Sequence, residues 1–285
     1  MTAFGPEMPP YREIAPGVRR LVAPNPSIMT GPGTNTYLFG NKETAVLDPG
    51  PAISEHIDSI VEHAAGSLRW ILVTHTHPDH SPAAKLLAAK INAELLGMRA
   101  PEHGHQDKTF QPDRVLADGD VLETSEFRLE VVHTPGHASN HVCYRHAALD
   151  WIFTGDHVID GSTVVIDPPD GNMKHYIESL QRLKDLQCTA LAPGHGEVID
   201  DPDRVIDWII AHRLQREDKV TAAVTAFPNH TSHQLVPHVY GDVDPKLYGW
   251  AERSLLAHLL KLEADGRAES RTGHWSMAPS PMTDK

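Results

Sequence analysis

Four residues that could hold metal ions lie within one six-residue segment, His75-Thr76-His77-Pro78-Asp79-His80. Imidazole nitrogens and carboxylate oxygens are typical zinc ligands, at about 2.0 to 2.2 Å from the ion. His75 and His77 are two residues apart and can share one ion, and Asp79 and His80 can then face a neighbouring ion. The spacing therefore predicts a metal site rather than a polar loop that happens to be rich in histidine.

Three further ligand-type residues each follow a glycine at the end of a short predicted strand. Glycine allows backbone turns that other residues resist, and it lets a loop approach a shared centre. One such position would be a weak signal, but together with the first segment there are four strand ends that carry metal-type side chains. The three are His137 in Thr134-Pro135-Gly136-His137, Asp156 in Thr154-Gly155-Asp156, and His195 in Pro193-Gly194-His195-Gly196.

Short strands and helices must position these residues. Residues 70–73 form an apolar run that predicts a buried strand ending just before the first segment, and Ser81 and Pro82 suit the cap and first position of a helix that continues to Ile91. The mixed order of elements predicts stacked sheets with helices outside. The other strands are expected at 18–22, 36–39, 45–47, 127–132, 143–144, 151–153 and 189–192, and helices at 53–65 and 176–186.

After residue 200 the alternation of short strands, helices and Gly/Pro-rich loops stops, and no loop there resembles a catalytic site. The pattern there predicts a long helix at 202–227, a second near Ser232, a third at 247–264 and a hairpin at 267–277, an arrangement that resembles a winged helix. We therefore predict two domains, a catalytic domain at 1–200 and a winged-helix-like domain at 201–285. The second has ten basic and twelve acidic residues. This balance favours packing or formation of a homodimer over nucleic-acid binding.

The composition of the chain limits its partners and location. Its 285 residues carry a formal net charge of -13, which repels phosphate backbones and disfavours nucleic acid as the main partner while leaving room for a local binding patch. No apolar run is long enough for a membrane span, and residues 1–10 show no secretory signal. The only cysteines, Cys143 and Cys188, lie far apart, so we expect a cytoplasmic protein with no membrane partner.

The motifs together resemble those of the metallo-β-lactamase superfamily over residues 18 to about 200. The resemblance implies a four-layer αββα sandwich of α/β class and two metal ions, zinc in the first place with iron or manganese as alternatives. It implies that one ion is bound by His75, His77 and His137, that the other is bound by Asp79, His80 and His195, and that Asp156 bridges them. The bridging aspartate is similar to the pattern of glyoxalase II.

A closer resemblance is to the lactamase-beta-like-2 group. It rests on Gly33-Thr34-Asn35-Thr36-Tyr37-Leu38, on the segment around His137, and on the helical tail with its hairpin. One departure is visible, because Ser81-Pro82-Ala83 stands where many members of the group have two glycines. This change affects the start of a helix and leaves the ligand set intact.

A dinuclear site of this kind is typical of a metal-dependent hydrolase, in which a metal-bound hydroxide attacks the substrate. Asp79 is the candidate catalytic residue, because it can orient the hydroxide and accept a proton. Our first hypothesis is hydrolysis of an ester, a thioester or a related small-molecule acyl substrate. The alternatives are cleavage of single-stranded RNA, as the resemblance to the lactamase-beta-like-2 group implies, and a non-catalytic metal-binding regulatory protein.

Several residues near the motifs remain open. Asp48 ends a strand and could bond to a ligand histidine, or it could simply be a turn carboxylate before Pro49-Gly50. His133 and His157 flank assigned ligands and could touch substrate, and His141 could support a ligand, although structural hydrogen bonding is the simpler interpretation. His103 and His105 lie in a polar loop and are not expected to bind metal.

Overall fold

The computed structural model describes residues 8–279. Most of the segment examined for a secretory signal, residues 1–10, and the basic residue Lys285 therefore lie outside the described residues. Within 8–279, no helix combines the length and the apolar character needed to cross a membrane.

The first sheet has seven strands in the order β1-β2-β3-β4-β5-β6-β7. Its first four strands are antiparallel neighbours, and β4 to β7 run parallel to one another. Parallel neighbours present their carboxyl ends at one edge of a sheet, so the loops after β4 and β5 leave side by side. The strands are β1 (Tyr11–Ala15), β2 (Val18–Val22), β3 (Asn35–Phe39), β4 (Thr44–Leu47), β5 (Leu68–Leu72), β6 (Glu94–Gly97) and β7 (Arg114–Val115).

The second sheet has five strands in the order β12-β11-β10-β9-β8. Strands β8 to β11 are antiparallel, and β12 pairs in parallel with β11, so the loops after β11 and β12 also leave from one edge. The strands are β8 (Val121–Glu123), β9 (Arg128–His133), β10 (Val142–His146), β11 (Trp151–Gly155) and β12 (Ala190–Pro193).

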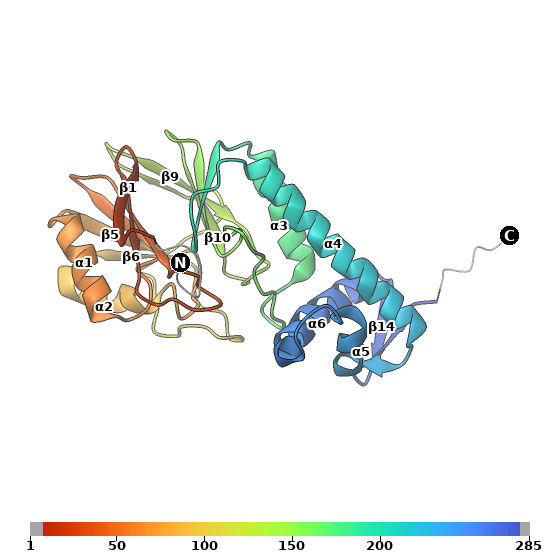
Figure 1. The fold of residues 1–285 in the computed structure, drawn as a ribbon. Coiled ribbons are helices and arrows are strands. Elements are labelled where there is room, and N and C mark those ends of the chain that lie inside the picture. Colours follow the sequence, from red (N-terminus) through yellow and green to blue (C-terminus); the bar gives the residue numbers. More distant parts are fainter. Residues whose placement is uncertain (1–7, 280–285) are drawn as a thin grey trace.

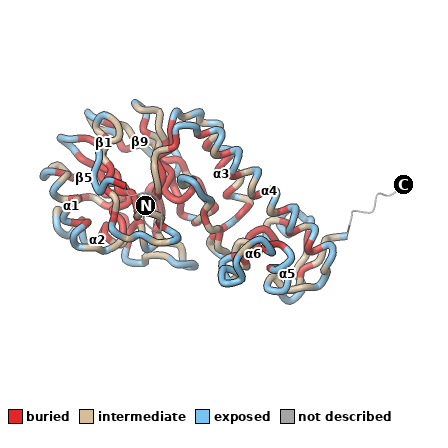
Figure 2. Tube along the Cα trace, in the orientation of Figure 1, coloured by how far each residue is buried: buried red, intermediate tan, exposed pale blue. Residues whose placement is uncertain are grey.

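Alternation of side chains along the strands builds four layers. In β3, Tyr37 and Phe39 face the second sheet and meet Phe153 at 4.9 and 4.7 Å between ring centroids. Leu38, between them, packs on the opposite side against α1 (Ser54–Ala64) and α2 (Pro82–Ile91). Helix α3 (Met173–Asp185) and the start of α4 (Pro202–Ala226) cover the outer face of the second sheet. Figure 1 shows the helices outside the two sheets, and Figure 2 shows buried residues concentrated between the layers.

The C-terminal domain continues from α4 (Pro202–Ala226) into α5 (Ser232–Val239), a short 3-10 helix η1 (Pro245–Leu247), α6 (Tyr248–Ala264) and the hairpin β14 (Ala268–Arg271) and β15 (His274–Met277). The two-residue strand β13 (His230–Thr231) pairs with β15. Figure 1 shows this domain beside α3, with α4 running from the sandwich to it. Three helices and a hairpin form the winged-helix arrangement predicted from the sequence.

Helix α4 packs against both parts of the molecule. Ile206 and Ile209, in its first half, join the apolar cluster of α3 and the second sheet. Val220 and Val224, in its second half, join the core formed with α5, α6 and β15. The boundary at residues 200/201 stays a prediction, and the packing shows that the helix after it is shared between the two cores.

The predicted strands and helices are present, with ends shifted by a few residues, but one cap was predicted wrongly. Ser81 stands before α2, yet its hydroxyl makes no capping hydrogen bond and instead donates to Asp107 Oδ2 at 2.8 Å. Strands β1, β6 to β8 and the two-residue β13 were not predicted from the sequence. Residues 94–97, in β6, are too short an apolar run to distinguish from the end of the preceding helix.

Candidate metal centre

The His75–His80 segment forms the loop between β5 and α2, and Asp48 at the end of β4 fixes where this loop begins. The two Asp48 carboxylate oxygens accept hydrogen bonds from the Thr74 backbone N–H at 2.7 Å and from the Thr74 hydroxyl at 2.8 Å. Asp48 itself has a φ of 48°, in the left-handed region, which turns its side chain toward the neighbouring loop. The parallel pairing of β4 and β5 therefore brings the carboxylate to the histidine-rich loop.

Three imidazoles form a first group. His77 Nδ1 lies 2.9 Å from His75 Nε2 and 2.9 Å from His137 Nε2. All three side chains are buried or half-buried, and their nitrogens lie close enough together to hold one metal ion. The third member comes from the other sheet, because His137 follows β9.

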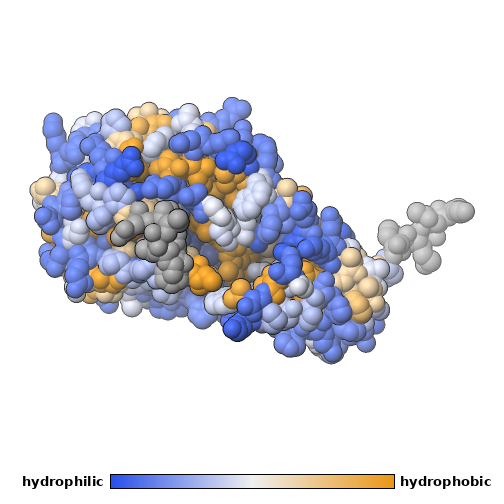
Figure 3. All heavy atoms as spheres, viewed as in Figure 1, coloured by the Kyte–Doolittle hydropathy of each residue, from blue (hydrophilic) through white to orange (hydrophobic). Residues whose placement is uncertain are grey.

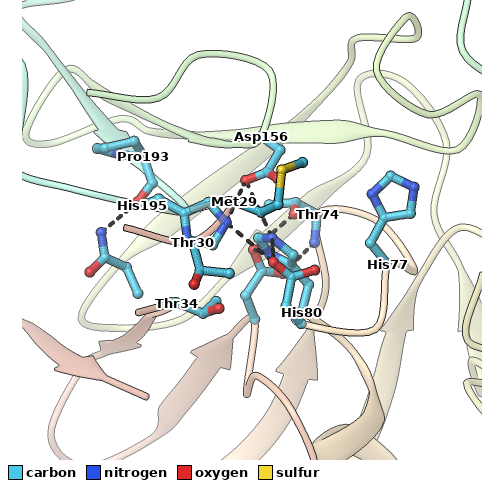
Figure 4. A network of polar contacts seen from close by, with 12 residues as sticks. Met29, Thr30, Thr34, Thr74, His77, His80, Asp156, Pro193 and His195 are labelled. Carbon is cyan, nitrogen blue, oxygen red and sulfur yellow. Dashed lines mark hydrogen bonds and ion pairs between the residues drawn. The ribbon is translucent and has the colours of Figure 1, made fainter. Parts of the chain in front are cut away.

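A second group contains two carboxylates and two imidazoles, from Asp79, His80, Asp156 and His195. Asp156 Oδ1 lies 3.3 Å from His80 Nε2 and 3.2 Å from His195 Nε2, and Asp79 Oδ2 lies 3.3 Å from His195 Nε2. Figure 4 shows Asp156 and His195 directed toward His80, with His77 farther off. The second oxygen of Asp156 lies 3.7 Å from His137 Nε2, so this carboxylate faces both groups.

Three buried atoms of the second group suit a bound cation. His80 Nε2, Asp156 Oδ1 and His195 Nε2 are shielded from solvent, and within residues 8–279 they face one another without forming a hydrogen bond of good geometry. An unpaired buried polar atom costs about 1 to 3 kcal/mol. A divalent metal ion would satisfy all three at once, and nitrogen and oxygen donors are those that zinc, iron and manganese accept. The donor set therefore fits the metal ions predicted from the sequence.

Burial and neighbouring charges shift the pKa values of the candidate ligand histidines in opposite directions in the two groups. Burial, assisted by the neighbouring His137, lowers the pKa of His77 to about 3. Burial also acts to lower the pKa of His80 and His195, but the carboxylates of Asp156 and Asp79 raise both overall, that of His195 to about 9. A metal ion in the second group must therefore displace protons, whereas the first group is ready to bind one at neutral pH.

Four of the five candidate histidine ligands hold their second ring nitrogen against an oxygen. His80 Nδ1 lies 3.0 Å from Asp48 Oδ2, and His75 Nδ1 lies 3.0 Å from the Thr74 hydroxyl. His137 Nδ1 lies 2.8 Å from the backbone oxygen of Val165, and His195 Nδ1 lies 3.2 Å from that of Gly33. Such contacts fix the ring orientation and tautomer of metal-binding histidines. Of the two interpretations of Asp48, the structure shows the contact with a candidate ligand histidine, His80.

The other histidines left open by the sequence lie behind or beside the two groups. His141 is fully buried and its Nδ1 lies 2.9 Å from the Thr134 hydroxyl. His157 is also fully buried, and its ring packs 4.8 Å from the ring of Tyr176. His103 does not belong to either group, and His105 lies on the wall of the adjoining cavity without joining them.

The two groups open into a cavity of about 760 Å³. Asp79, whose side chain is 27% exposed, lies on its surface together with His77, His137, Asp156 and His195. The walls come from the loops 28–32, 104–106 and 159–167 and from the first turn of α6. A cavity of this size lies within the range of sites for small organic ligands, about 300 to 1,000 Å³.

Residues 29–195 match the family model described as metallo-beta-lactamase superfamily, which is more than half of the 285 residues. The chain belongs to the metallo-β-lactamase superfamily. Residues 231–275 match a second model, the beta-lactamase associated winged helix domain. Both the family and the C-terminal winged helix predicted from the sequence are confirmed.

Relatives of this superfamily member carry two kinds of name. The Beta-lactamase-like protein 2 homolog of Drosophila melanogaster is 30% identical over 275 residues, which cover 91% of this chain and 92% of that protein. The Atrochrysone carboxyl ACP thioesterase of Aspergillus chevalieri is 33% identical over 275 residues, which cover 91% of this chain and 85% of that protein. The first agrees with the resemblance to the lactamase-beta-like-2 group.

A solved structure agrees with the fold of this metallo-β-lactamase-superfamily chain. A beta-lactamase domain protein from Burkholderia ambifaria superposes with a TM-score of 0.79 at 22% identity, covering 94% of this chain and 93% of that one. The superposition spans both the sandwich and the C-terminal domain, and at this identity it supports the fold alone.

The C-terminal domain of this superfamily member reaches the candidate metal centre through the 159–167 loop. Arg213 of α4 is buried and donates a hydrogen bond to the Val164 backbone oxygen, next to the carbonyl that orients His137. Arg253 of α6 forms an ion pair with Asp167 at the other end of the loop. These contacts could not be predicted from the sequence, because no local pattern marks a backbone oxygen as the partner of a distant arginine.

Proposed function

We propose that this chain is a dinuclear metal-dependent hydrolase that acts on an ester, a thioester or a related acyl substrate. One observation carries the proposal: seven ligand-type side chains form two adjoining groups at the end of a cavity, and three of their buried atoms face one another without a well-formed hydrogen bond among the described residues. An orienting contact for most of the histidines supports the same interpretation.

In this proposal His75, His77 and His137 hold one ion, Asp79, His80 and His195 hold the other, and Asp156 is shared. Two such ions would activate water as a nucleophile and polarise the oxygen of the bond to be cleaved. Asp79 is the partly exposed carboxylate of the second group and is placed to orient that water and to accept its proton. Zinc is the first choice of metal, with iron or manganese as alternatives.

The lining of the cavity favours a neutral acyl substrate over RNA. Among the residues that the structure describes, none that lines the cavity is a lysine or arginine, whereas Asp160, Asp170 and Glu197 line it beyond the metal groups. Such a wall repels phosphate groups. The thioesterase name of the relative from Aspergillus chevalieri supports the acyl class. Cleavage of single-stranded RNA is the second candidate. It is supported by the name of the relative from Drosophila melanogaster, which agrees with the resemblance to the lactamase-beta-like-2 group.

Three further predictions from the sequence stay proposals: the cytoplasmic location, the homodimer and the domain boundary. The two cysteines are free, which agrees with a reducing cytoplasm. A homodimer formed through the C-terminal domain remains a proposal, as does a boundary between two domains at residues 200/201. A purely regulatory metal-binding role is the weakest alternative, because it does not account for the open cavity beside the metal groups.

The proposal is tested by loading the purified protein with zinc, iron or manganese and measuring hydrolysis of neutral thioesters, lactones and single-stranded RNA. We expect close to two metal ions per chain, thioester or lactone hydrolysis, and its loss on chelation. Asp156→Asn should abolish hydrolysis with little loss of fold, because it weakens a ligand shared by both ions.

His103→Ala is the matched control, because His103 lies in a polar loop and belongs to neither metal group. It should retain full activity. A protein that binds no transition metal, or a His103→Ala variant as inactive as Asp156→Asn, would contradict the proposal. Cleavage of RNA without hydrolysis of any acyl compound would promote the second candidate.

A further inference from the structure

We propose that the acyl group of the substrate is bulky and apolar, and that it lies between the 28–29 segment and Trp250 of the C-terminal domain. This inference rests on the proposed acyl hydrolysis, and it names the substrate class and the residues that select it. It assigns a binding role to a residue of the winged-helix domain.

One wall of the cavity carries apolar side chains that the fold itself leaves uncovered. Ile28 is 77% exposed and Met29 is 47% exposed, although both are large and apolar. Their exposure is built into the loop, because the Thr30 hydroxyl donates to the Asn25 backbone oxygen at 2.6 Å and Ser27 bonds to Thr30 at 2.8 Å. In Figure 4 the Met29 side chain lies on the side of Asp156 and His195.

Another part of the cavity lining is provided by α6. Trp250, in its first turn, is 49% exposed and lines the same cavity as Met29. The Arg253 guanidinium lies 5.5 Å from the centre of the Trp250 ring and forms the ion pair with Asp167. This contact ties the tryptophan to the loop that orients His137. An indole held in this way offers a rigid apolar surface at little cost in conformational entropy.

Further apolar side chains continue this lining. Ile159, Val164 and Val165 line the cavity beside the metal groups. Figure 3 shows apolar atoms in the hollow between the sandwich and the C-terminal helices. Because metal groups and apolar walls belong to one cavity, a substrate with its carbonyl at the metal groups extends its acyl chain along these walls. Contiguous exposed apolar surface beside polar groups is typical of a ligand site.

The test compares N-acetylcysteamine thioesters of acetate and of decanoate, using the metal-loaded full-length protein. We expect the wild type to hydrolyse the decanoyl ester with a kcat/KM at least about tenfold above that of the acetyl ester, since each buried methylene adds to binding. Trp250→Ala and Met29→Ala should each lower the ratio of kcat/KM for the decanoyl thioester to kcat/KM for the acetyl thioester by about tenfold, because only the longer acyl chain reaches these side chains.

Trp208→Ala is the matched control. Trp208 is 48% exposed on α4 and does not line the cavity, so its removal should leave both thioesters unaffected. A flat dependence on acyl length, or equal effects of Trp250→Ala and Trp208→Ala, would overturn the inference while leaving acyl hydrolysis intact.

Binding of a decyl thioether of N-acetylcysteamine, which lacks the thioester carbonyl that hydrolysis attacks, separates the inference from the proposed function. Calorimetry should show binding to the wild type and to Trp208→Ala, and binding at least about tenfold weaker to Trp250→Ala. This result would support the apolar site even if no thioester were hydrolysed. Equal binding by all three proteins would overturn it.

Discussion

At the scale of single residues, Asp48 connects the fold to the candidate metal centre. Its carboxylate holds the Thr74 backbone with one oxygen and His80 Nδ1 with the other. It is almost fully buried, and it directly follows β4, the strand beside the one that precedes the His75–His80 loop. The orientation of the candidate ligand His80 therefore depends on a residue that belongs to neither metal group.

We predict that Asp48→Asn lowers the affinity of the second metal group for zinc by about 10- to 100-fold, as is usual when the carboxylate partner of a ligand histidine is lost. The asparagine keeps the shape of the side chain but not its charge. Competition with a chromophoric chelator measures the affinity. Asp58→Asn, which changes an exposed carboxylate of α1, is the control and should bind zinc as the wild type does. Identical affinities in both variants would contradict this role.

At the scale of secondary-structure elements, Glu217 joins α4 to α6 and to the start of the hairpin. Its side chain is 4% exposed, and its two oxygens lie 2.9 Å from Lys261 Nζ and 2.7 Å from Arg267 Nη1. Burial acts to raise the pKa of Glu217, but His258 and Lys261 lower it overall to about 2. The charged form is therefore the one that the folded C-terminal domain favours.

We predict that Glu217→Gln lowers the free energy of unfolding by about 3 kcal/mol at pH 7, because it leaves two cations without their buried partner. A depressed pKa stabilises the fold above the unfolded-state value, about 4.5, and this stabilisation is lost as the pH falls toward 2. The difference between variant and wild type should therefore shrink below pH 4.5. Urea unfolding monitored at several pH values measures it.

Glu269→Gln is the control for this prediction. Glu269 pairs with the exposed Arg271 two residues along the same strand, β14, and an exposed ion pair contributes about 0 to 1 kcal/mol. A loss for Glu217→Gln no larger than that for Glu269→Gln, or a difference that does not vary with pH, would show that the buried pairs do not stabilise the domain.

At the scale of the whole molecule, charge separates acyl hydrolysis from RNA cleavage. The net charge is -13, and seven of the nine basic side chains described after residue 200 lie within ion-pair distance of a carboxylate. An eighth, Arg213, is buried against Val164. The winged-helix domain therefore presents little uncompensated positive charge to a phosphate backbone.

We predict that single-stranded RNA binds no more tightly than about 1 µM at physiological salt, with a shallow dependence on salt. Each neutralised phosphate contributes about 0.7 to the slope of log affinity against log salt. Fluorescence anisotropy with a labelled oligonucleotide at several salt concentrations measures both quantities. Nanomolar binding with a slope corresponding to about four or more phosphates would instead favour the RNA hypothesis.

The sequence by itself determined the candidate ligand set and most of the helices and strands that carry it. His75, His77, Asp79 and His80 are close along the chain, so a single strand-to-helix turn suffices to gather them. The glycines before the other candidates also carry a local signal. Gly136 and Gly155 have positive φ values, and a Cβ on Gly194 would lie 2.8 Å from Asp156 Oδ1, so these positions require glycine.

Only the tertiary structure decided what surrounds the centre. Packing of the two sheets brings His137, Asp156 and His195 to the loop after β5, and parallel pairing of β4 with β5 places Asp48 against His80. The Val165 carbonyl, the Arg213 contact and the position of Trp250 depend on segments far apart in the chain, and backbone oxygens carry no side-chain signal. Local patterns report which residues can bind, whereas distances between remote segments are fixed by the packing of the whole core.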